Sequence, residues 1–224
     1  MLLKKGKKLN FILYIVLILI LTSVNNYNYN YKNIFIIKNI QVNGFSAEKN
    51  KFIKEDIQAI FDKNIIFLGK KNFKKLIDRN DTKELIVKKI YPNKLLISFI
   101  PAKPISIIEN QNNKIVLGDN GKILDIEINE NNFPVVRGSE NISYIFEVVN
   151  LLISSKFDYN NIKNIIFFKS GRFDIKLKNQ LLIRFPINYS MEIINYGSDL
   201  LNNKKFVNSK TIDLRINNRI IKYE

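Results

Sequence analysis

The spacing of hydrophobic and polar residues predicts short β-strands and amphipathic helices. In the run 34–45, Ile40 and Val42 face one way, while the polar residues beside them face the other. This two-residue alternation is typical of a half-buried strand, and Asn43-Gly44 ends it with residues that favour turns. The first unit of the fold therefore begins with a strand.

Two further strand pairs are predicted in the middle of the chain. The run from Glu84 to Ile108 predicts two strands closed by a turn at Tyr91-Pro92-Asn93-Lys94, where Pro92 can preset the turn backbone. The run from Lys114 to Asp125 predicts a hairpin that turns at Asp119-Asn120-Gly121. Asn-Gly supplies the positive φ angles that tight hairpins need.

Two amphipathic helices are predicted between the first strands, at Lys51–Lys63 and Lys71–Asn80. Their apolar stripes contain Ile53, Ile57, Ile60 and Phe61 in the first helix and Phe73, Leu76 and Ile77 in the second. Together with the strands, they predict a β-α-α-β-β unit that packs both helices on one face of a small sheet.

The C-terminal half predicts a second unit of helices and strands. The expected elements are a helix at Glu140–Ser155, strands at Ile162–Phe168, Arg172–Leu177 and Leu181–Phe185, a helix at Ser190–Asn202, and a strand at Thr211–Ile220. No strand is expected after the last one, so we place it at the edge of the sheet. An edge strand offers unpaired backbone groups that a partner can complete by β-augmentation.

The N-terminus predicts a membrane anchor. Four lysines, Lys4, Lys5, Lys7 and Lys8, precede the uncharged stretch from Phe11 to Val24. Counted from Leu9, this stretch gives roughly 16 residues, or about 24 Å of helix, against a hydrocarbon core of about 30 Å. A cleavable signal peptide is the alternative, but the residues near any cut fit its small-residue pattern poorly. The lysines predict a cytoplasmic N-terminus, and residues 25–33, rich in Asn and Tyr, predict a linker.

Composition excludes several classes of protein. The chain has 224 residues, 46% hydrophobic and 12% aromatic, enough for a packed core in one or two domains. It has no cysteine and no histidine, which excludes disulfides, thiol chemistry and histidine-based acid–base catalysis. The net charge of +16 suggests an anionic partner. Because the lysines are scattered and form no basic–aromatic platform, a solvated surface is favoured over nucleic-acid binding. Binding to anionic lipid or cell-wall polymers stays open.

One catalytic motif competes with a structural role. Ser46-Ala47-Glu48-Lys49 fits the S-x-x-K nucleophile motif of penicillin-binding proteins, but its companions are incomplete, since Leu200 follows Ser198-Asp199. Ser46 precedes a predicted helix, so a cap or turn is favoured. Asp213 and Arg215 predict an exposed ion pair, worth about 0–1 kcal/mol at most.

Six short motifs, in this order, resemble the FtsQ family of bacterial cell-division proteins, called DivIB in Gram-positive bacteria. No single motif is specific, but together they cover nearly the whole chain. They are IQVNG (Ile40–Gly44), YPNKLLI (Tyr91–Ile97), KPIS (Lys103–Ser106), VLGDNGKIL (Val116–Leu124), FPVVRG (Phe133–Gly138) and Asp213-Leu214-Arg215. The chain departs from the family pattern at Pro101, where an acidic residue is common, and at Ile216, where an aromatic residue is typical.

The resemblance implies an α+β fold. A single transmembrane helix precedes a β-α-α-β-β POTRA domain, which is followed by a mixed α/β domain with a mainly antiparallel sheet. The implied parts are a basic cytoplasmic tail at 1–8, a signal anchor at 9–24, a linker at 25–33, the POTRA domain at 34–102 and the C-terminal domain at 103–224. The expected structural turns lie at Gly44, Pro92, Gly121 and Gly138.

The resemblance also implies a function through protein–protein contacts, without catalysis. A protein of this family lies in the bacterial inner membrane at the division septum, with its C-terminal domains outside the cytoplasm. It links early division proteins to the septal peptidoglycan synthesis complex. The implied partners are bitopic proteins of the FtsB and FtsL type, bound through Thr211, Ile212, Asp213, Leu214, Arg215, Ile216, Asn217 and Ile220. No catalytic, cofactor or metal site is expected. The alternatives are a POTRA-bearing envelope tether or outer-membrane assembly factor, and a basic polymer-binding envelope module.

Overall fold

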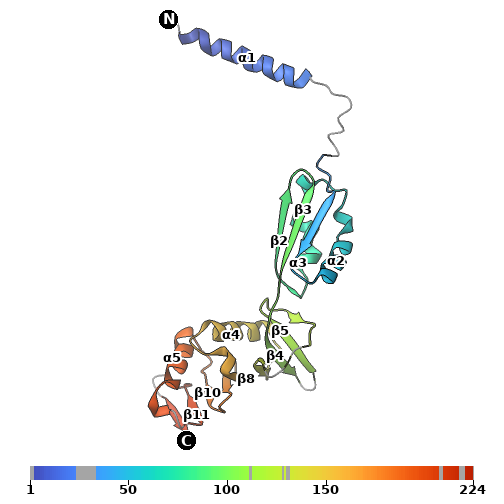
Figure 1. The fold of residues 1–224 in the computed structure, drawn as a ribbon. Helices are drawn as coiled ribbons and strands as arrows, with labels where there is room; N and C mark the ends of the chain where they lie inside the picture. Colours follow the sequence, from blue (N-terminus) through green and yellow to red (C-terminus); the bar gives the residue numbers. More distant parts are fainter. Residues whose placement is uncertain are drawn as a thin grey trace.

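The computed structural model describes residues 3–23, 34–110, 113–127, 129, 132–206, 209–216 and 220–223. Within these residues the chain forms an N-terminal helix, a first unit with a three-stranded sheet and a second unit with a nine-stranded sheet (Figure 1). The α-helices are α1 (Leu3–Ser23), α2 (Ala47–Asp56), α3 (Lys74–Ile77), α4 (Ile142–Ser154) and α5 (Met191–Leu201). The 3-10 helices are η2 (Gln58–Ile60), η3 (Ile65–Phe67), η4 (Lys70–Phe73), η6 (Tyr159–Asn161) and η7 (Lys204–Phe206). The strands are β1 (Asn39–Asn43), β2 (Thr82–Ile90), β3 (Lys94–Pro101), β4 (Pro104–Asn110), β5 (Asn113–Gly118), β6 (Ile123–Leu124), β7 (Val135–Arg137), β8 (Ile162–Phe167), β9 (Phe173–Leu177), β10 (Leu182–Arg184), β11 (Thr211–Asp213) and β12 (Ile221–Tyr223).

The first unit packs its helices on one face of a sheet with the order β1-β3-β2. β1 runs parallel to β3, and β2 runs antiparallel to it. The predicted alternation in β1 is confirmed, because Ile40 is buried while Asn39 and Gln41 are exposed. The core of this unit joins residues of the sheet to residues of the helical segment, among them Ile40, Leu95, Ile97, Phe99, Ile53, Ile57 and Leu76.

The two helices of the first unit differ from the predicted ones in position and length. α2 begins earlier than predicted because the Ser46 side chain caps it, accepting a hydrogen bond from the backbone N–H of Lys49 at 3.4 Å. It also ends earlier, and η2 carries Ile60 into the core. The second helix is reduced to η4 and α3, so Ile77, predicted as a core residue, is 45% exposed.

The second unit contains the large mixed sheet, with the order β12-β11-β10-β9-β8-β7-β4-β5-β6 among the described residues. Five of its eight neighbouring pairs are antiparallel. The other three pairs, β10 with β11, β4 with β7 and β7 with β8, are parallel. The sheet is therefore mixed and mainly antiparallel, as the predicted fold class requires.

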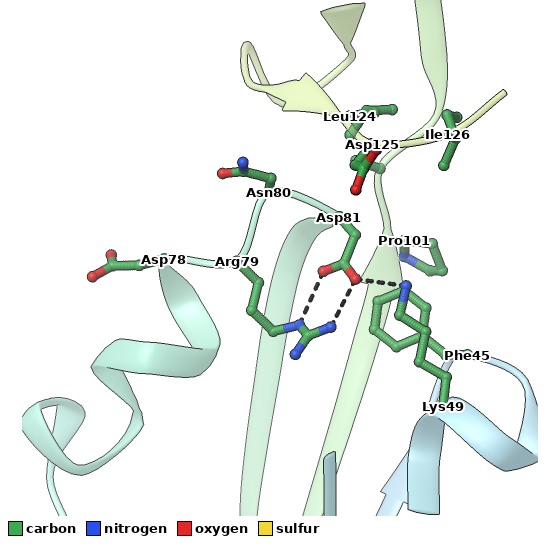
Figure 2. A pocket seen from close by; sticks show the side chains of 11 residues that line it. Phe45, Lys49, Asp78, Arg79, Asn80, Asp81, Pro101, Leu124, Asp125 and Ile126 are labelled. Atoms are coloured by element: carbon green, nitrogen blue, oxygen red, sulfur yellow. Dashed lines mark hydrogen bonds and ion pairs between the residues drawn. The ribbon is translucent and has the colours of Figure 1, made fainter. Parts of the chain in front are cut away.

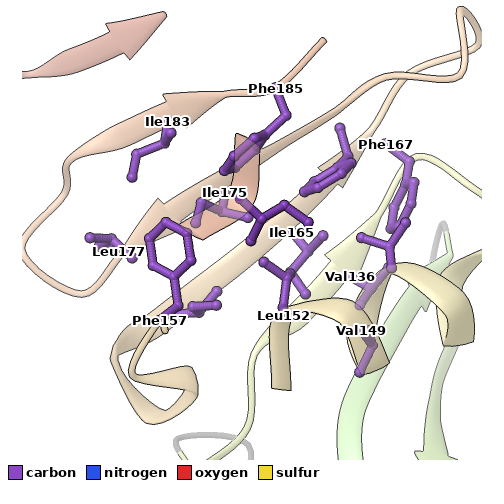
Figure 3. Close-up of a cluster of buried hydrophobic side chains, with 14 of the residues drawn as sticks. Val136, Val149, Leu152, Phe157, Ile165, Phe167, Ile175, Leu177, Ile183 and Phe185 are labelled. Atoms are coloured by element: carbon purple, nitrogen blue, oxygen red, sulfur yellow. The ribbon is translucent and has the colours of Figure 1, made fainter. Parts of the chain in front are cut away.

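Helices α4 and α5 supply the core on one face of this sheet. In α4, Ile145, Val149 and Leu152 are fully buried, at the spacing of one helix face. Figure 3 shows Val149 and Leu152 facing side chains from the strands, including Ile165 and Ile175. Since alternate strand residues point to opposite faces, the other face of β9 to β11 carries a different set of side chains.

Two strand predictions in this unit are wrong. The run from Glu84 to Ile108 holds three strands, because the chain leaves the first sheet after β3 and enters the second as β4. The strand predicted at Thr211–Ile220 ends at Asp213, and β12 pairs outside it. The edge strand on this side of the sheet is therefore β12, and β11 lies inside the sheet.

Helix α1 covers the predicted anchor. Its apolar side chains from Phe11 to Leu21 are 42% to 69% exposed. Within the part of the chain that the structure describes, no helix combines the length and the apolar character needed to cross a membrane. The first turns of α1 contain Lys4, Lys5, Lys7 and Lys8, whose side chains lie outside the described part of the chain. Their role in orienting α1 across a membrane stays a prediction.

Candidate functional site

Three charged residues lie in register on β9, β10 and β11, three neighbouring strands of the second sheet. Arg184 of β10 is the register partner of Asp174 in β9 and of Asp213 in β11. Register partners point to the same face of a sheet, so this row lies on one face. The neighbouring residues Ile183 and Ile212 belong to the helix-covered core on the other face. The charged row is therefore on the face away from that core.

Both carboxylates of the row are nearly inaccessible. The side chain of Asp174 is 5% exposed and that of Asp213 is 3% exposed, whereas the Arg184 side chain is 34% exposed. Arg184 lies 3.8 Å from each, through Nε to Asp174 Oδ2 and through Nη1 to Asp213 Oδ2. These separations indicate ion pairs without good hydrogen-bond geometry.

Arg215 forms the closer pair with Asp213. Its Nε donates to Oδ1 at 2.8 Å, its Nη2 donates to Oδ2 at 2.5 Å, and its backbone N–H donates to Oδ1 at 3.1 Å. These hydrogen bonds hold the pKa of Asp213 below its usual value, although burial opposes them. The predicted Asp213–Arg215 pair is present, but the prediction of an exposed pair is wrong because the carboxylate is buried.

Asp174 has the opposite environment. Burial raises the pKa of Asp174, and the charges of Arg172, Arg184 and Arg215 only partly oppose this effect. Its Oδ1 atom is buried and has no hydrogen-bond partner among the described residues. The charged row therefore joins one well-satisfied carboxylate to one poorly satisfied carboxylate through the shared Arg184.

A groove of about 790 Å³ opens beside this row. It is lined by Ser170, Arg172, Pro186, Ile187, Asn188, Arg215 and Ile216, and we call it the C-terminal groove. Ile187 is 57% exposed and Ile216 is 49% exposed. The Arg172 guanidinium lies 4.3 Å from the centre of the Phe168 ring. Because Arg215 is already paired with Asp213, the groove offers apolar surface together with the Arg172 side chain, which suits an apolar segment that carries an acidic residue.

The edge strand β12 lies next to the row. In its pairing with β11, Ile221 is opposite Asp213 and Tyr223 is opposite Thr211. The side chain of Tyr223 is 49% exposed. β12 and the C-terminal groove therefore both adjoin the charged row, and together we call them the candidate surface.

The structure places the predicted partner-binding residues in different environments. Ile212, Asp213 and Leu214 are buried, so a contact between them and a partner stays a prediction. Arg215 and Ile216 line the groove, while Thr211 and Ile220 are partly buried. Asn217 lies outside the described residues.

Other residues of this surface were missed at the sequence level. Arg172, Ile187 and Tyr223 lie outside the predicted set but belong to the groove or to β12. The apolar-polar alternation of Ile221, Lys222 and Tyr223 is a local signal for β12, and it is too short to predict a strand. Nothing local connects residues 170–172 with residues 186–188.

The remaining predicted positions have structural roles. Gly44, Gly121 and Gly138 have positive φ angles of 118°, 74° and 85°, as their predicted turns require. Pro92 lies in the turn between β2 and β3. Ser46 caps α2, and Lys49 pairs with Asp81, so the described contacts of the S-x-x-K motif are those of a helix cap. No group of acidic side chains suited to a metal ion occurs in the described part of the chain.

A second pocket, of about 680 Å³, lies where the two units meet. Figure 2 shows the Asp81 carboxylate between Arg79 and Lys49, with Asp125 of the second unit on the other side of the pocket. Arg79 Nη2 is 2.8 Å and Lys49 Nζ is 2.6 Å from Asp81 Oδ2. Burial alone would raise the pKa of Asp81, but these hydrogen bonds outweigh it and lower the pKa to about 2. The cations here are already paired, so this pocket is a weaker candidate for ligand binding.

The whole chain matches no family model and no curated protein. Among solved structures it is similar to the major extracytoplasmic domain of the trans isomer of the bacterial cell-division protein DivIB from Geobacillus stearothermophilus. The similarity covers 46% of this chain and 87% of that chain, with 14% sequence identity and a TM-score of 0.34. The family named in this comparison is the one that the sequence motifs resemble.

Proposed function

We propose that this chain is a non-enzymatic cell-division protein of the FtsQ/DivIB kind, which links early division proteins to the septal peptidoglycan synthesis complex through protein–protein contacts. The observation that carries the proposal is that a sheet edge, β12, and a groove with exposed apolar side chains both adjoin the charged row. Such an arrangement suits backbone pairing of β12 with an extended segment of a partner, with the groove selecting its side chains.

The positions of the six motifs in the fold support the same proposal. IQVNG ends β1, YPNKLLI contains the β2–β3 turn, and VLGDNGKIL contains the β5–β6 hairpin. KPIS begins β4, FPVVRG contains β7, and Asp213-Leu214-Arg215 ends β11. Every motif thus lies where a strand begins, ends or turns, which are the positions at which backbone geometry restricts the sequence.

Membrane anchoring through α1 is part of the proposal. The apolar side chains of α1 are exposed on all sides, from Phe11 at 66% to Leu21 at 69%. A helix that is apolar all round is stable when lipid or protein covers it. With four lysines at its start, α1 would keep the N-terminus in the cytoplasm and place both sheet units outside it, at the bacterial inner membrane of the septum.

Binding to bitopic partners of the FtsB and FtsL type tests the proposal. The full chain and the partner pair are reconstituted together in vesicles, and affinity is measured for single substitutions Ile187→Asp and Ile216→Asp in the groove. We expect each to weaken binding at least about tenfold, because a carboxylate replaces a desolvated apolar contact. The matched control is Ile86→Asp, which changes an isoleucine of the first sheet that is 37% exposed.

The outcomes separate the candidate functions. Equal affinity for all three variants and the parent would place the interface elsewhere on the molecule. Absence of any binding to the partner pair, together with a steeply salt-dependent affinity for anionic cell-wall polymer, would replace the proposal by the polymer-binding function that the net charge of +16 suggests.

A further inference from the structure

An exposed apolar cluster lies at one end of the first sheet. It contains Ile34, Ile66, Phe67, Ile90 and Tyr91, which we call the sheet tip. Phe67 is 83% exposed, Tyr91 58%, Ile66 46% and Ile90 42%. Large side chains at such exposure contribute nothing to the core of this unit, and a contiguous exposed apolar patch indicates an interaction surface.

Contacts among three chain segments hold the sheet tip together. The backbone N–H of Ile65 donates to the carbonyl of Phe35 at 2.8 Å, and the rings of Phe35 and Tyr91 lie 6.4 Å apart, edge to face. Lys89 Nζ donates to the carbonyl oxygens of Ile66 at 3.1 Å and Leu68 at 2.8 Å. Segments 34–36, 65–68 and 89–91 therefore meet at one place.

The exposure of Phe67 is fixed by the local structure. The Asn64 side chain caps η3 by accepting a hydrogen bond from the backbone N–H of Ile66 at 2.9 Å. Ile65, the first residue of η3, is completely buried and holds this turn against the core. The next two side chains consequently point outward, so the sheet tip presents them in a defined orientation.

Lysines are concentrated in the segments that form and flank the sheet tip. Segments 34–38, 62–71 and 88–94 contain seven lysines and a single acid, Asp62, which gives a formal charge of +6. Exposed lysines of these segments include Lys38, Lys63, Lys70 and Lys88. Lysines close to an anionic bilayer are attracted to it, and aromatic and apolar side chains within a basic rim are typical of proteins that lie on such a surface.

The position of the sheet tip in the chain favours a membrane as its partner. The turn at 91–93 is at the end of the β2–β3 hairpin, while the second unit follows the opposite end of β3, as Figure 1 shows. Residues 24–33 connect α1 to the segment that enters the sheet tip. A chain of ten residues reaches at most about 36 Å, so an α1 in the bilayer would hold the tip close to the headgroups.

We propose that the sheet tip binds the surface of an anionic lipid bilayer, so that the first unit lies against the membrane that holds α1. This inference rests on the proposed anchoring by α1. Phe67 and Tyr91 insert at the level of the headgroups, and the lysines pair with anionic lipids. The contact limits how far the first unit can rotate about the connecting segment.

The absence of tryptophan from the chain allows a direct test. The full chain with Phe67→Trp is reconstituted in vesicles of phosphatidylcholine, alone or mixed with phosphatidylglycerol, and its fluorescence is measured with and without bromine-labelled lipids. We expect an emission shift to shorter wavelength and several-fold stronger quenching in the anionic vesicles. The matched control is Ile77→Trp. Ile77 is 45% exposed in the same unit and lies at the end opposite to the sheet tip, where its carbonyl oxygen accepts a hydrogen bond from Lys122 of the second unit. The emission of this variant should be neither shifted nor quenched.

Flotation of the vesicles separates the two proposals. If the chain does not float with the vesicles, the anchor proposal fails. If it floats but the Phe67→Trp chain is quenched no more than the Ile77→Trp chain, the sheet-tip proposal fails and the anchor stands. An emission shift that requires an added protein partner, and occurs without lipid contact, would assign the sheet tip to a protein interface and overturn the proposal.

Discussion

Arg215 closes over the buried carboxylate of Asp213, two residues before it in the chain, with Nη2 at 2.5 Å from Oδ2. The same carboxylate is 3.8 Å from Arg184, which also reaches Asp174. Because Arg215 lines the C-terminal groove, the pair connects the inside of the sheet to the candidate binding surface. The strength of the Arg215–Asp213 pair therefore affects the stability of the second unit and the shape of the groove.

Replacing Arg215 by methionine should destabilise the second unit. Asp213, whose side chain is 3% exposed in the parent, would keep only the distant Arg184 as a cationic partner, so we expect a loss of about 1.5–3 kcal/mol, the range for hydrogen bonds to charged groups. Chemical denaturation of the parent and the variant measures this loss of unfolding free energy. The matched control is Arg137→Met, which breaks the pair with Glu109 at an arginine that is 54% exposed. That change should cost under about 1 kcal/mol, and equal losses would contradict the role given to Asp213.

Alanine at Gly44 should destabilise the first unit more than alanine at Gly121 destabilises the second. Both glycines have positive φ, which costs a side chain of order 1–3 kcal/mol. At Gly44 the new Cβ would lie 2.1 Å from the backbone oxygen of Phe99, whereas at Gly121 it would meet the Phe146 ring at 3.1 Å. A ring can move more easily than backbone in a paired strand, so we expect the larger loss at Gly44.

Thermal unfolding of both variants checks this order. Gly69→Ala is the control, because Gly69 has ordinary φ and no heavy atom within 4 Å of the added Cβ. We expect it to be neutral or slightly stabilising. A loss at Gly69 equal to that at Gly44 would contradict the argument from backbone contact.

The elements that sequence reasoning predicted well have strong local signals. The alternation around Ile40, the Asn120-Gly121 hairpin and the stripe of α4 each follow from periodicity or turn chemistry within a few residues. Helix ends were predicted less well, since the cap at Ser46 moved α2 toward the N-terminus. The local sequence pattern was thus sufficient to predict whether a segment forms a helix or a strand. It was insufficient to predict the residues at which the element begins and ends.

The candidate site depends on contacts between distant segments, which local pattern does not contain. Asp174 and Asp213 become neighbours only because β10 pairs with β9 on one side and with β11, in parallel, on the other. Asp213 was consequently predicted as an exposed residue, and Arg172 and Ile187 were not selected at all. Tertiary pairing decided which polar residues became buried, as it commonly does in sheets.

Asn120→Ala should loosen the junction between the two units without unfolding either. The Asn120 side chain belongs to the β5–β6 turn and donates to the backbone carbonyls of Asn80 at 2.7 Å and Thr82 at 2.9 Å in the first unit. Neither core contains it, so the expected change in unfolding free energy is about 1 kcal/mol or less. Distances between spin labels, one on each unit, should become more broadly distributed. Asn160→Ala, at an exposed position of η6, should leave the distribution unchanged. An unchanged distribution for Asn120→Ala would show that other contacts hold the junction.

Acid should remove the stabilisation that Asp81 contributes to the first unit. The hydrogen bonds from Arg79 and Lys49 lower its pKa to about 2 in the folded chain, against about 3.9 in an unfolded chain. A group with a lowered folded pKa contributes stability above its unfolded pKa and loses it as the pH falls through the folded value. The contribution should therefore be complete above about pH 5, decline from about pH 4, and be absent below about pH 2.

The difference between the parent and Asp81→Asn isolates this effect from other titrating groups. Because Asp81 is 30% exposed and Lys49 is 42% exposed, we expect a difference of about 1 kcal/mol at neutral pH, less than a fully buried pair would give. Urea unfolding from about pH 7 down to about pH 2 should show the two stability curves converging at the acid end. Asn160→Ala, at an exposed position of η6, changes no titratable group and provides the control, so its curve should run parallel to that of the parent. A difference for Asp81→Asn that stays constant over the whole range would mean that the lost contact is packing, because only a charge effect must vanish when the carboxylate is protonated.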